Sequence, residues 1–61
     1  MTAITPGHSI LVVDDDPDIA LGLQDLLDHD GYQVSVAGTC AEALTQTHDH
    51  HYNAVLLDLG L

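Results

Sequence analysis

Two short apolar runs in this chain each end in aspartate. Residues 10–13 are followed by three aspartates at 14–16, and residues 54–57 are followed by Asp58. Short apolar runs that alternate with longer segments of helical periodicity predict βαβ units and a parallel sheet. The carboxyl ends of parallel strands meet at one edge of a sheet, where open α/β folds bind their ligands. The pattern therefore predicts a cluster of carboxylates at that edge.

The first half of the chain is expected to form a strand and a helix. Residues 9–13 make the strand, buried on both faces because the run is continuously apolar. Asp16 can cap the helix, Pro17 suits its first position, and Asp30 followed by Gly31 ends it, since glycine accepts the left-handed conformation that closes many helices. One stripe of apolar side chains on this helix is expected to pack on the sheet. Its members are Ile19, Leu23, Leu26 and Leu27.

The second half repeats the pattern. Residues 32–37 alternate apolar and polar side chains, as a half-exposed strand would. Thr39 and Glu42 have the spacing of a capping box, in which each side chain accepts a backbone N–H at the start of a helix. That helix is expected over residues 40–50, and a third strand over residues 53–58.

These elements predict an α/β fold with the order β-α-β-α-β. Right-handed crossovers place the first strand between the other two, which gives a partial doubly wound parallel sheet of spatial order 2-1-3. Asp14 and Asp15 then stand beside Asp58. Carboxylates gathered in this way repel one another unless a hard cation joins them, and Mg²⁺ suits one or two carboxylates together with water and phosphate oxygens. We therefore expect a site for Mg²⁺ and a phosphoryl group.

Length and charge limit the classes of partner. The chain has 61 residues, so it is at most one small domain, and its formal net charge is −10 with no lysine or arginine. Nucleic acid and anionic membranes are poor partners for this segment, because both are bound mainly through basic side chains. We expect residues 1–8 to be a disordered leader without a signal peptide, and no apolar run reaches the ~20 residues of a membrane span. A cytosolic location follows as the default, and the lone Cys40 agrees with a reducing compartment.

The residues that carry these features resemble the receiver domain of two-component response regulators. The similarity lies in the segments ILVVDDDPDI, GLQDLL, AEAL and YNAVLLDLGL. It implies that Asp58 is the phosphoacceptor and takes a phosphoryl group from a histidine kinase or phosphotransfer protein. It also implies that Asp14 and Asp15 hold Mg²⁺ together with Asp58 and the backbone carbonyl of Gly60, and that Asp16 is only a helix cap. Such a domain is a signalling module and not an enzyme in the usual sense.

The chain also departs from that family. Receivers close a fourth strand with Ser or Thr and a fifth with Lys, and both side chains contact the phosphoryl oxygens. This chain ends at Leu61 and contains no lysine. We therefore expect residues 9–61 to be the N-terminal part of a receiver, truncated after the third strand and impaired in phosphorylation. The third strand becomes an apolar sheet edge, which invites self-association.

Two other functions remain open. An apolar strand followed by Asp-x-Asp also begins the haloacid dehalogenase-like phosphatases, with Asp14 as nucleophile and Asp16 as acid or base. Against this, those enzymes usually have Thr or Val where this chain has Asp18, and they use a later lysine. The other alternative is an interaction or remnant protein without phosphorylation, which pairs through its exposed sheet edge or has no activity.

Simpler interpretations exist for individual residues. Asp14 and Asp15 can be anions stabilised at a helix N-terminus, and Asp58 alone can be a turn residue at a strand end. The histidines within residues 48–51 indicate a solvated helix end, because a transition-metal site needs three or four converging ligands. The occurrence of acids on two strand ends favours the joint site.

Overall fold

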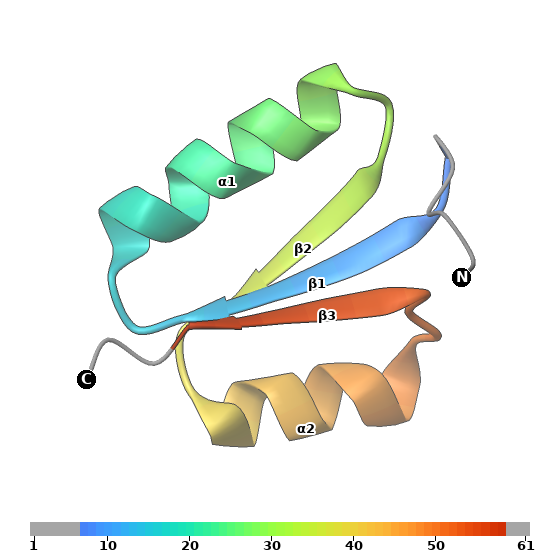
Figure 1. Cartoon of the computed structure of the whole chain (residues 1–61). Coiled ribbons are helices and arrows are strands. Elements are labelled where there is room, and N and C mark those ends of the chain that lie inside the picture. Colours follow the sequence, from blue (N-terminus) through green and yellow to red (C-terminus); the bar gives the residue numbers. More distant parts are fainter. Residues whose placement is uncertain (1–6, 59–61) are drawn as a thin grey trace.

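A computed structural model of the chain describes residues 7–58, which form a sheet with helices on both faces (Figure 1). Every predicted element is present, and no boundary differs from its prediction by more than one residue. The elements are β1 (Ser9–Asp14), α1 (Pro17–His29), β2 (Gln33–Ala37), α2 (Cys40–Asp49) and β3 (Ala54–Asp58).

The sheet is parallel, and its spatial order is β2-β1-β3. In the register of the sheet, Val12 of β1 lies opposite Val36 of β2 and Leu56 of β3. The first crossover runs from β1 through α1 to β2, and the second runs back from β2 through α2 to β3 on the other side of β1. The two crossovers thus run in opposite directions across the sheet, so α1 covers one face and α2 covers the other (Figure 1). The predicted fold, a partial doubly wound sheet of order 2-1-3, is confirmed.

The core is built around β1. Its residues 10–13 are at most 3% exposed, which confirms a strand buried on both faces. Ala20 of α1 and Ala37 of β2 are the other buried apolar residues in the described part of the chain. On the side of α2, the half-buried Ala43 and Tyr52 pack against this core. Burial is thus concentrated in one strand of a very small domain.

The prediction for the apolar stripe of α1 is wrong for two of its four members. Leu23 and Leu27 are half-buried against the sheet, but Ile19 and Leu26 are 48% and 60% exposed. The sheet-facing side is centred on Ala20, which is 1% exposed. The helix is therefore rotated relative to the stripe.

A polar side chain accounts for part of this rotation. Gln24 is half-buried, and its side-chain amide donates a hydrogen bond of 3.4 Å to the carbonyl of Val34 in β2. A prediction from apolar periodicity assigns glutamine to the solvent-facing side of a helix. It therefore places the centre of the buried face away from Ala20 and Gln24.

The end of α1 is set by a glycine. Gly31 has φ 97°, the left-handed conformation. Its N–H donates to the carbonyl of Asp28 at 3.0 Å, and the N–H of Tyr32 donates to the carbonyl of Leu27 at 3.1 Å. These two bonds form the Schellman motif, which satisfies the last carbonyls of a helix. The predicted helix end is confirmed.

The capping box at the start of α2 is formed in a modified way. The Thr39 hydroxyl accepts the N–H of Glu42 at 3.1 Å, as predicted. The Glu42 carboxylate accepts the N–H of Gly38, also at 3.1 Å, and not that of Thr39. Glu42 therefore ties down the loop before α2 one residue earlier than the motif predicts.

β3 is an edge strand, and among the described elements it makes close backbone contacts with β1 alone. Asn53 anchors the start of β3 through two hydrogen bonds to Ser9. Its side-chain oxygen accepts the N–H of Ser9 at 2.8 Å, and its own N–H donates to the carbonyl of Ser9, also at 2.8 Å. The next apolar side chains are poorly covered: Val55, Leu56 and Leu57 are 50%, 41% and 63% exposed. The predicted apolar sheet edge is confirmed.

The predicted leader falls mostly outside the described residues. Gly7 and His8 are placed, and each joins the start of β2: the Gly7 N–H donates to the carbonyl of Gly31, and the Gln33 N–H donates to the carbonyl of His8. Disorder of residues 1–6 stays a prediction. Within residues 7–58, neither helix is long and apolar enough to cross a membrane.

Two glycines should respond to alanine with opposite signs. Gly31→Ala forces a side chain into the left-handed conformation and should lower the free energy of unfolding by roughly 1 kcal/mol. Gly22 is an exposed residue in the middle of α1, and a Cβ added there meets no atom within 4 Å. Gly22→Ala should therefore raise the free energy of unfolding by about 0.5–1 kcal/mol. Urea unfolding followed by circular dichroism measures both, and shifts of the same sign would contradict the assigned helix end.

Candidate functional site

The carboxyl end of β1 carries a buried carboxylate. Asp14 is 2% exposed, and its Oδ1 accepts the backbone N–H of Asp16 at 2.9 Å. Its Oδ2 is also buried and has no hydrogen-bond partner among the described residues. Burying a carboxylate oxygen without a partner is unfavourable. The arrangement therefore fits a carboxylate that completes its contacts with a ligand.

The turn after β1 separates the roles of the three aspartates. Asp16 is the N-cap of α1, and its Oδ1 accepts the N–H groups of Asp18 at 3.0 Å and Ile19 at 3.4 Å. Pro17 follows as the first helical residue, where its missing N–H does no harm. Asp16 is thus a helix cap, as predicted. Asp15, which lies between Asp14 and Asp16, is exposed.

The end of β3 lies at the same edge. In the parallel register, Asp58 of β3 is the backbone partner of Asp14, and neighbouring strands are about 4.8 Å apart. The backbone therefore brings the two predicted strand-end acids to adjacent positions. The Asp58 side chain and the whole of Gly60, the predicted carbonyl ligand, lie outside what the structure describes.

A hollow of about 440 Å³ opens at this acidic edge, between the start of α1 and the loop that leads into α2. Three carboxyl-bearing residues are among those that line it: Asp14, Asp15 and Glu42. Because the chain has no lysine or arginine, no basic side chain can offset these charges from within. The hollow is suited to a cation and not to a free anion.

Glu42 is the lining residue that sequence reasoning did not assign to the site. The capping-box pattern placed it at the start of α2, and helices that follow parallel strands begin at the carboxyl edge of the sheet. These two facts together would have placed it near Asp14. Its carboxylate is already engaged by the Gly38 N–H, so it adds negative charge and stabilises the loop.

The donor set distinguishes among metals. Carboxylate oxygens are the ligands of hard cations such as Mg²⁺, whereas zinc sites use histidine and cysteine. No group of three or more His, Cys, Asp or Glu side chains within the described part of the chain is placed to hold an ion. The described carboxylates therefore do not form a complete metal site by themselves, although their oxygens are of the kind that hard cations bind.

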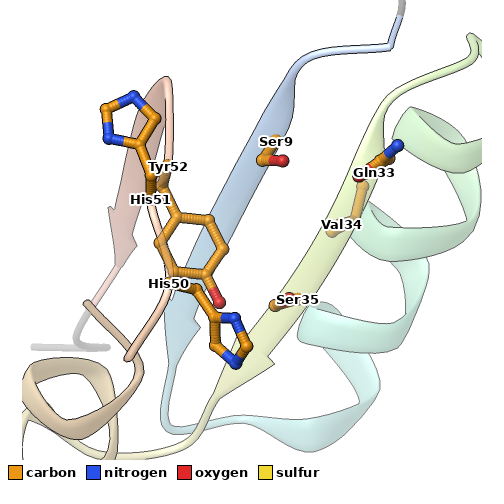
Figure 2. Close-up of a pocket in the computed structure, with 7 residues that line it drawn as sticks. All are labelled: Ser9, Gln33, Val34, Ser35, His50, His51 and Tyr52. Atoms are coloured by element: carbon orange, nitrogen blue, oxygen red, sulfur yellow. The ribbon is translucent and has the colours of Figure 1, made fainter. Parts of the chain in front are cut away.

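The histidines near the end of α2 lie at the opposite edge. A hollow of about 260 Å³ there is lined by Ser9, Ser35, His50 and Tyr52, among others (Figure 2). The His50 and Tyr52 rings meet edge to face, with centroids 6.5 Å apart, and Figure 2 shows the His51 ring pointing away from the strands. The imidazoles diverge, which agrees with a solvated helix end and not with a metal centre.

Comparison with known proteins gives one family. The model of the family described as the response regulator receiver domain matches residues 10–61. The chain is 44% identical over 52 residues to the transcriptional regulatory protein PmrA of Pectobacterium parmentieri, and 46% identical over 52 residues to the transcriptional regulatory protein KdpE of Mycobacterium tuberculosis. It is 44% identical over 57 residues to the DNA-binding response regulator MtrA of Mycolicibacterium smegmatis.

These matches cover most of this chain and a small part of each relative. They span 85% of the chain for PmrA and KdpE and 93% for MtrA, but only 23%, 23% and 25% of those proteins. No solved structure matches the chain at a significant level. The similarity therefore concerns about a quarter of the length of these relatives.

Removing the buried charge should stabilise the fold when no divalent cation is present. Asp14→Asn keeps the acceptor for the Asp16 N–H and replaces a partnerless carboxylate oxygen by a less costly amide, so the free energy of unfolding in EDTA should rise by roughly 1 kcal/mol. Asp28→Asn removes the same charge from an exposed position of α1 and should change it by less than about 0.5 kcal/mol. Equal shifts in urea unfolding would show that only net charge matters.

Proposed function

Because this chain belongs to the response regulator receiver family, we propose that it is a phosphoacceptor module of a histidine-to-aspartate phosphorelay, with Asp58 as the acceptor. The observation that supports this most directly is the backbone pairing of Asp58 with Asp14 at one edge of the sheet. Within that pair, Oδ2 of Asp14 is buried and has no hydrogen-bond partner among the described residues. A metal-assisted phosphoryl site requires acids in this arrangement.

In this proposal Asp14 and Asp15 hold Mg²⁺, and Asp58 and the carbonyl of Gly60 complete the protein ligands. The ion, when bound, supplies positive charge that offsets the oxygens of the incoming phosphoryl group. The chain itself positions the first ligand: the Asp16 N–H holds one oxygen of Asp14, which leaves Oδ2 for the cation. The Asp16 side chain in turn fixes that turn to the first N–H groups of α1.

The reaction transfers a phosphoryl group between two side chains. An oxygen of the Asp58 carboxylate attacks phosphorus, the new O–P bond forms as the bond from phosphorus to the histidine nitrogen of the donor breaks, and that nitrogen keeps the electron pair. The product is an acyl phosphate. With a net charge of −10 and no lysine or arginine, the chain offers little attraction to an anionic donor, so slow phosphorylation is part of the proposal.

The alternatives have less support. The family match is to receivers, which does not favour a haloacid dehalogenase-like phosphatase. In addition, Asp16, which would be the acid or base of such a phosphatase, is engaged as a helix cap. A remnant without phosphorylation is the remaining alternative, and the labelling experiment below separates it from the receiver.

The proposed partner is a histidine kinase or phosphotransfer protein, and the proposed location is the cytosol. The names of the relatives refer to transcription and DNA binding. The present segment has no lysine or arginine with which to hold DNA phosphates, so we propose no contact with nucleic acid through it.

Incubation with Mg²⁺ and excess acetyl phosphate should add one phosphoryl group to Asp58. The mass gain should be released by hydroxylamine, which cleaves acyl phosphates, and acetate is the leaving group. Asp58→Asn should abolish the gain, whereas Asp25→Asn, which removes an exposed acid of α1, should retain it. A gain on Asp14 would support the phosphatase, and no gain in any variant would support the remnant.

Binding of Mg²⁺ should be visible without phosphorylation. An ion that binds only the folded state stabilises it by about 1.4 kcal/mol at ten times its dissociation constant. The unmodified chain should gain this stability in MgCl₂ over NaCl of equal ionic strength, and Asp14→Asn should not. A gain that Asp14→Asn retains would mean that Mg²⁺ only screens the surface charge, even if Asp58 accepts a phosphoryl group.

A further inference from the structure

The outer edge of β2 is occupied by side chains from both helices. Successive residues of a strand direct their backbone N–H and C=O groups to alternate sides. Gln33 faces β1, since its N–H donates to the carbonyl of His8, so Val34 and Val36 direct their backbone groups away from β1. Among the described strands, β1 is the sole neighbour of β2. The carbonyls of Val34 and Val36 therefore lie on the outer edge of β2.

Each of these two carbonyls accepts a hydrogen bond from a glutamine. The side-chain amide of Gln24 in α1 donates to Val34 at 3.4 Å, and that of Gln46 in α2 donates to Val36 at 3.0 Å. Both glutamines are half-buried, and each stands ten residues from its partner, one before β2 and the other after it. Because α1 and α2 lie on opposite faces of the sheet (Figure 1), the edge is held from both faces.

The bond of Gln46 is fixed by a second contact. Its side-chain oxygen accepts the hydroxyl of the half-buried Tyr52 at 3.1 Å, and Tyr52 packs against the core. The amide of Gln46 is therefore held between the tyrosine and the strand edge, with an N–H directed at the carbonyl of Val36. Moving this glutamine away from the edge breaks two hydrogen bonds.

The sequence of β2 itself carries none of the usual features that protect a sheet edge. Natural edges are kept from pairing by charged side chains, by proline, by bulges or by a covering element. Residues 33–37 contain no charged side chain and no proline, and they pair with β1 in continuous register without a bulge. Two of the five are valines, which favour strands. Protection of this edge therefore depends on groups outside the strand.

We propose that Gln24 and Gln46 keep the outer edge of β2 from accepting another strand. A strand that adds to an edge is held by main-chain hydrogen bonds, and both outward carbonyls that would accept its N–H groups are already bonded. An incoming strand must displace both glutamines, and two ordinary hydrogen bonds correspond to roughly a thirtyfold change in an equilibrium constant. These bonds oppose an added strand from any source, including β2 of a second copy of the chain.

Sedimentation of the 61-residue chain across a range of concentrations tests the role of the glutamines. Gln24→Met combined with Gln46→Met keeps side chains of similar length but removes both donors. The double variant should associate with a constant at least about tenfold above that of the unmodified chain. The matched control is Gln33→Met, which makes the same change at an exposed position of β2 itself. An association constant that does not rise, or that rises equally with Gln33→Met, overturns the proposal.

Amide hydrogen exchange identifies the edge that pairs. In the double variant, the outward N–H groups of Val34 and Val36 should become protected as the concentration rises. Those of Ala54 and Leu56 should not, although they point outward on β3, where the N–H of Asn53 faces β1. Protection of Ala54 and Leu56 alone would place the association on β3, and loss of protection throughout the sheet would show association through unfolding. Either result overturns the proposal.

The single variant Gln24→Met serves the same test if the double variant does not fold. It loses one long hydrogen bond and leaves the contacts of Gln46 with Val36 and Tyr52 in place. Its association constant should rise by a smaller factor, with protection of the Val34 N–H. A folded Gln24→Met chain that associates no more than the unmodified chain contradicts the proposal.

Discussion

The burial of β1 is the constraint on which the rest of this structure depends. β1 contacts every other element of the described chain, while β3 is held by β1 alone. Its residues 10–13 fill the space between α1 and α2, and apart from Ala37 the apolar side chains of the outer strands are less covered. The hydrophobic free energy of folding is therefore concentrated in a few side chains of one strand. A domain of this size buries only about 60% of its unfolded surface, so its free energy of unfolding is expected to be small.

The acidic edge is positioned by the same strand. Once residues 10–13 are buried, Asp14 must follow into a partly closed space, and the register of β3 brings Asp58 to the neighbouring position. The unfavourable burial of one carboxylate is thus imposed by the core that precedes it. Both helices begin at this edge as well, and their N-terminal N–H groups are taken by the side chains of Asp16 and Thr39. The helix caps therefore use oxygens of Asp16 and Thr39, and Oδ2 of Asp14 is not involved in capping.

Much of this arrangement could be predicted from the order of residues. Strand and helix limits follow from periodicity and from Pro17 and Gly31, whose backbone conformations are restricted in known ways. The rotation of α1 could not be predicted, because the buried face depends on Gln24 finding a carbonyl on β2. The burial of Asp14 could not be predicted either, because it depends on how the neighbouring elements pack around the end of β1. The side-chain placement of Asp58 stays a prediction.

One chain of contacts joins the acidic edge to the first helix. Oδ1 of Asp14 is bonded to the Asp16 N–H, and Oδ1 of Asp16 is bonded to the N–H groups of Asp18 and Ile19. No other residue stands between these two sets of bonds, so the most enclosed carboxylate of the described chain and the first turn of α1 share one rigid connection of backbone and side chain. The geometry of the acidic edge is therefore tied to the start of the helix and not to a free loop.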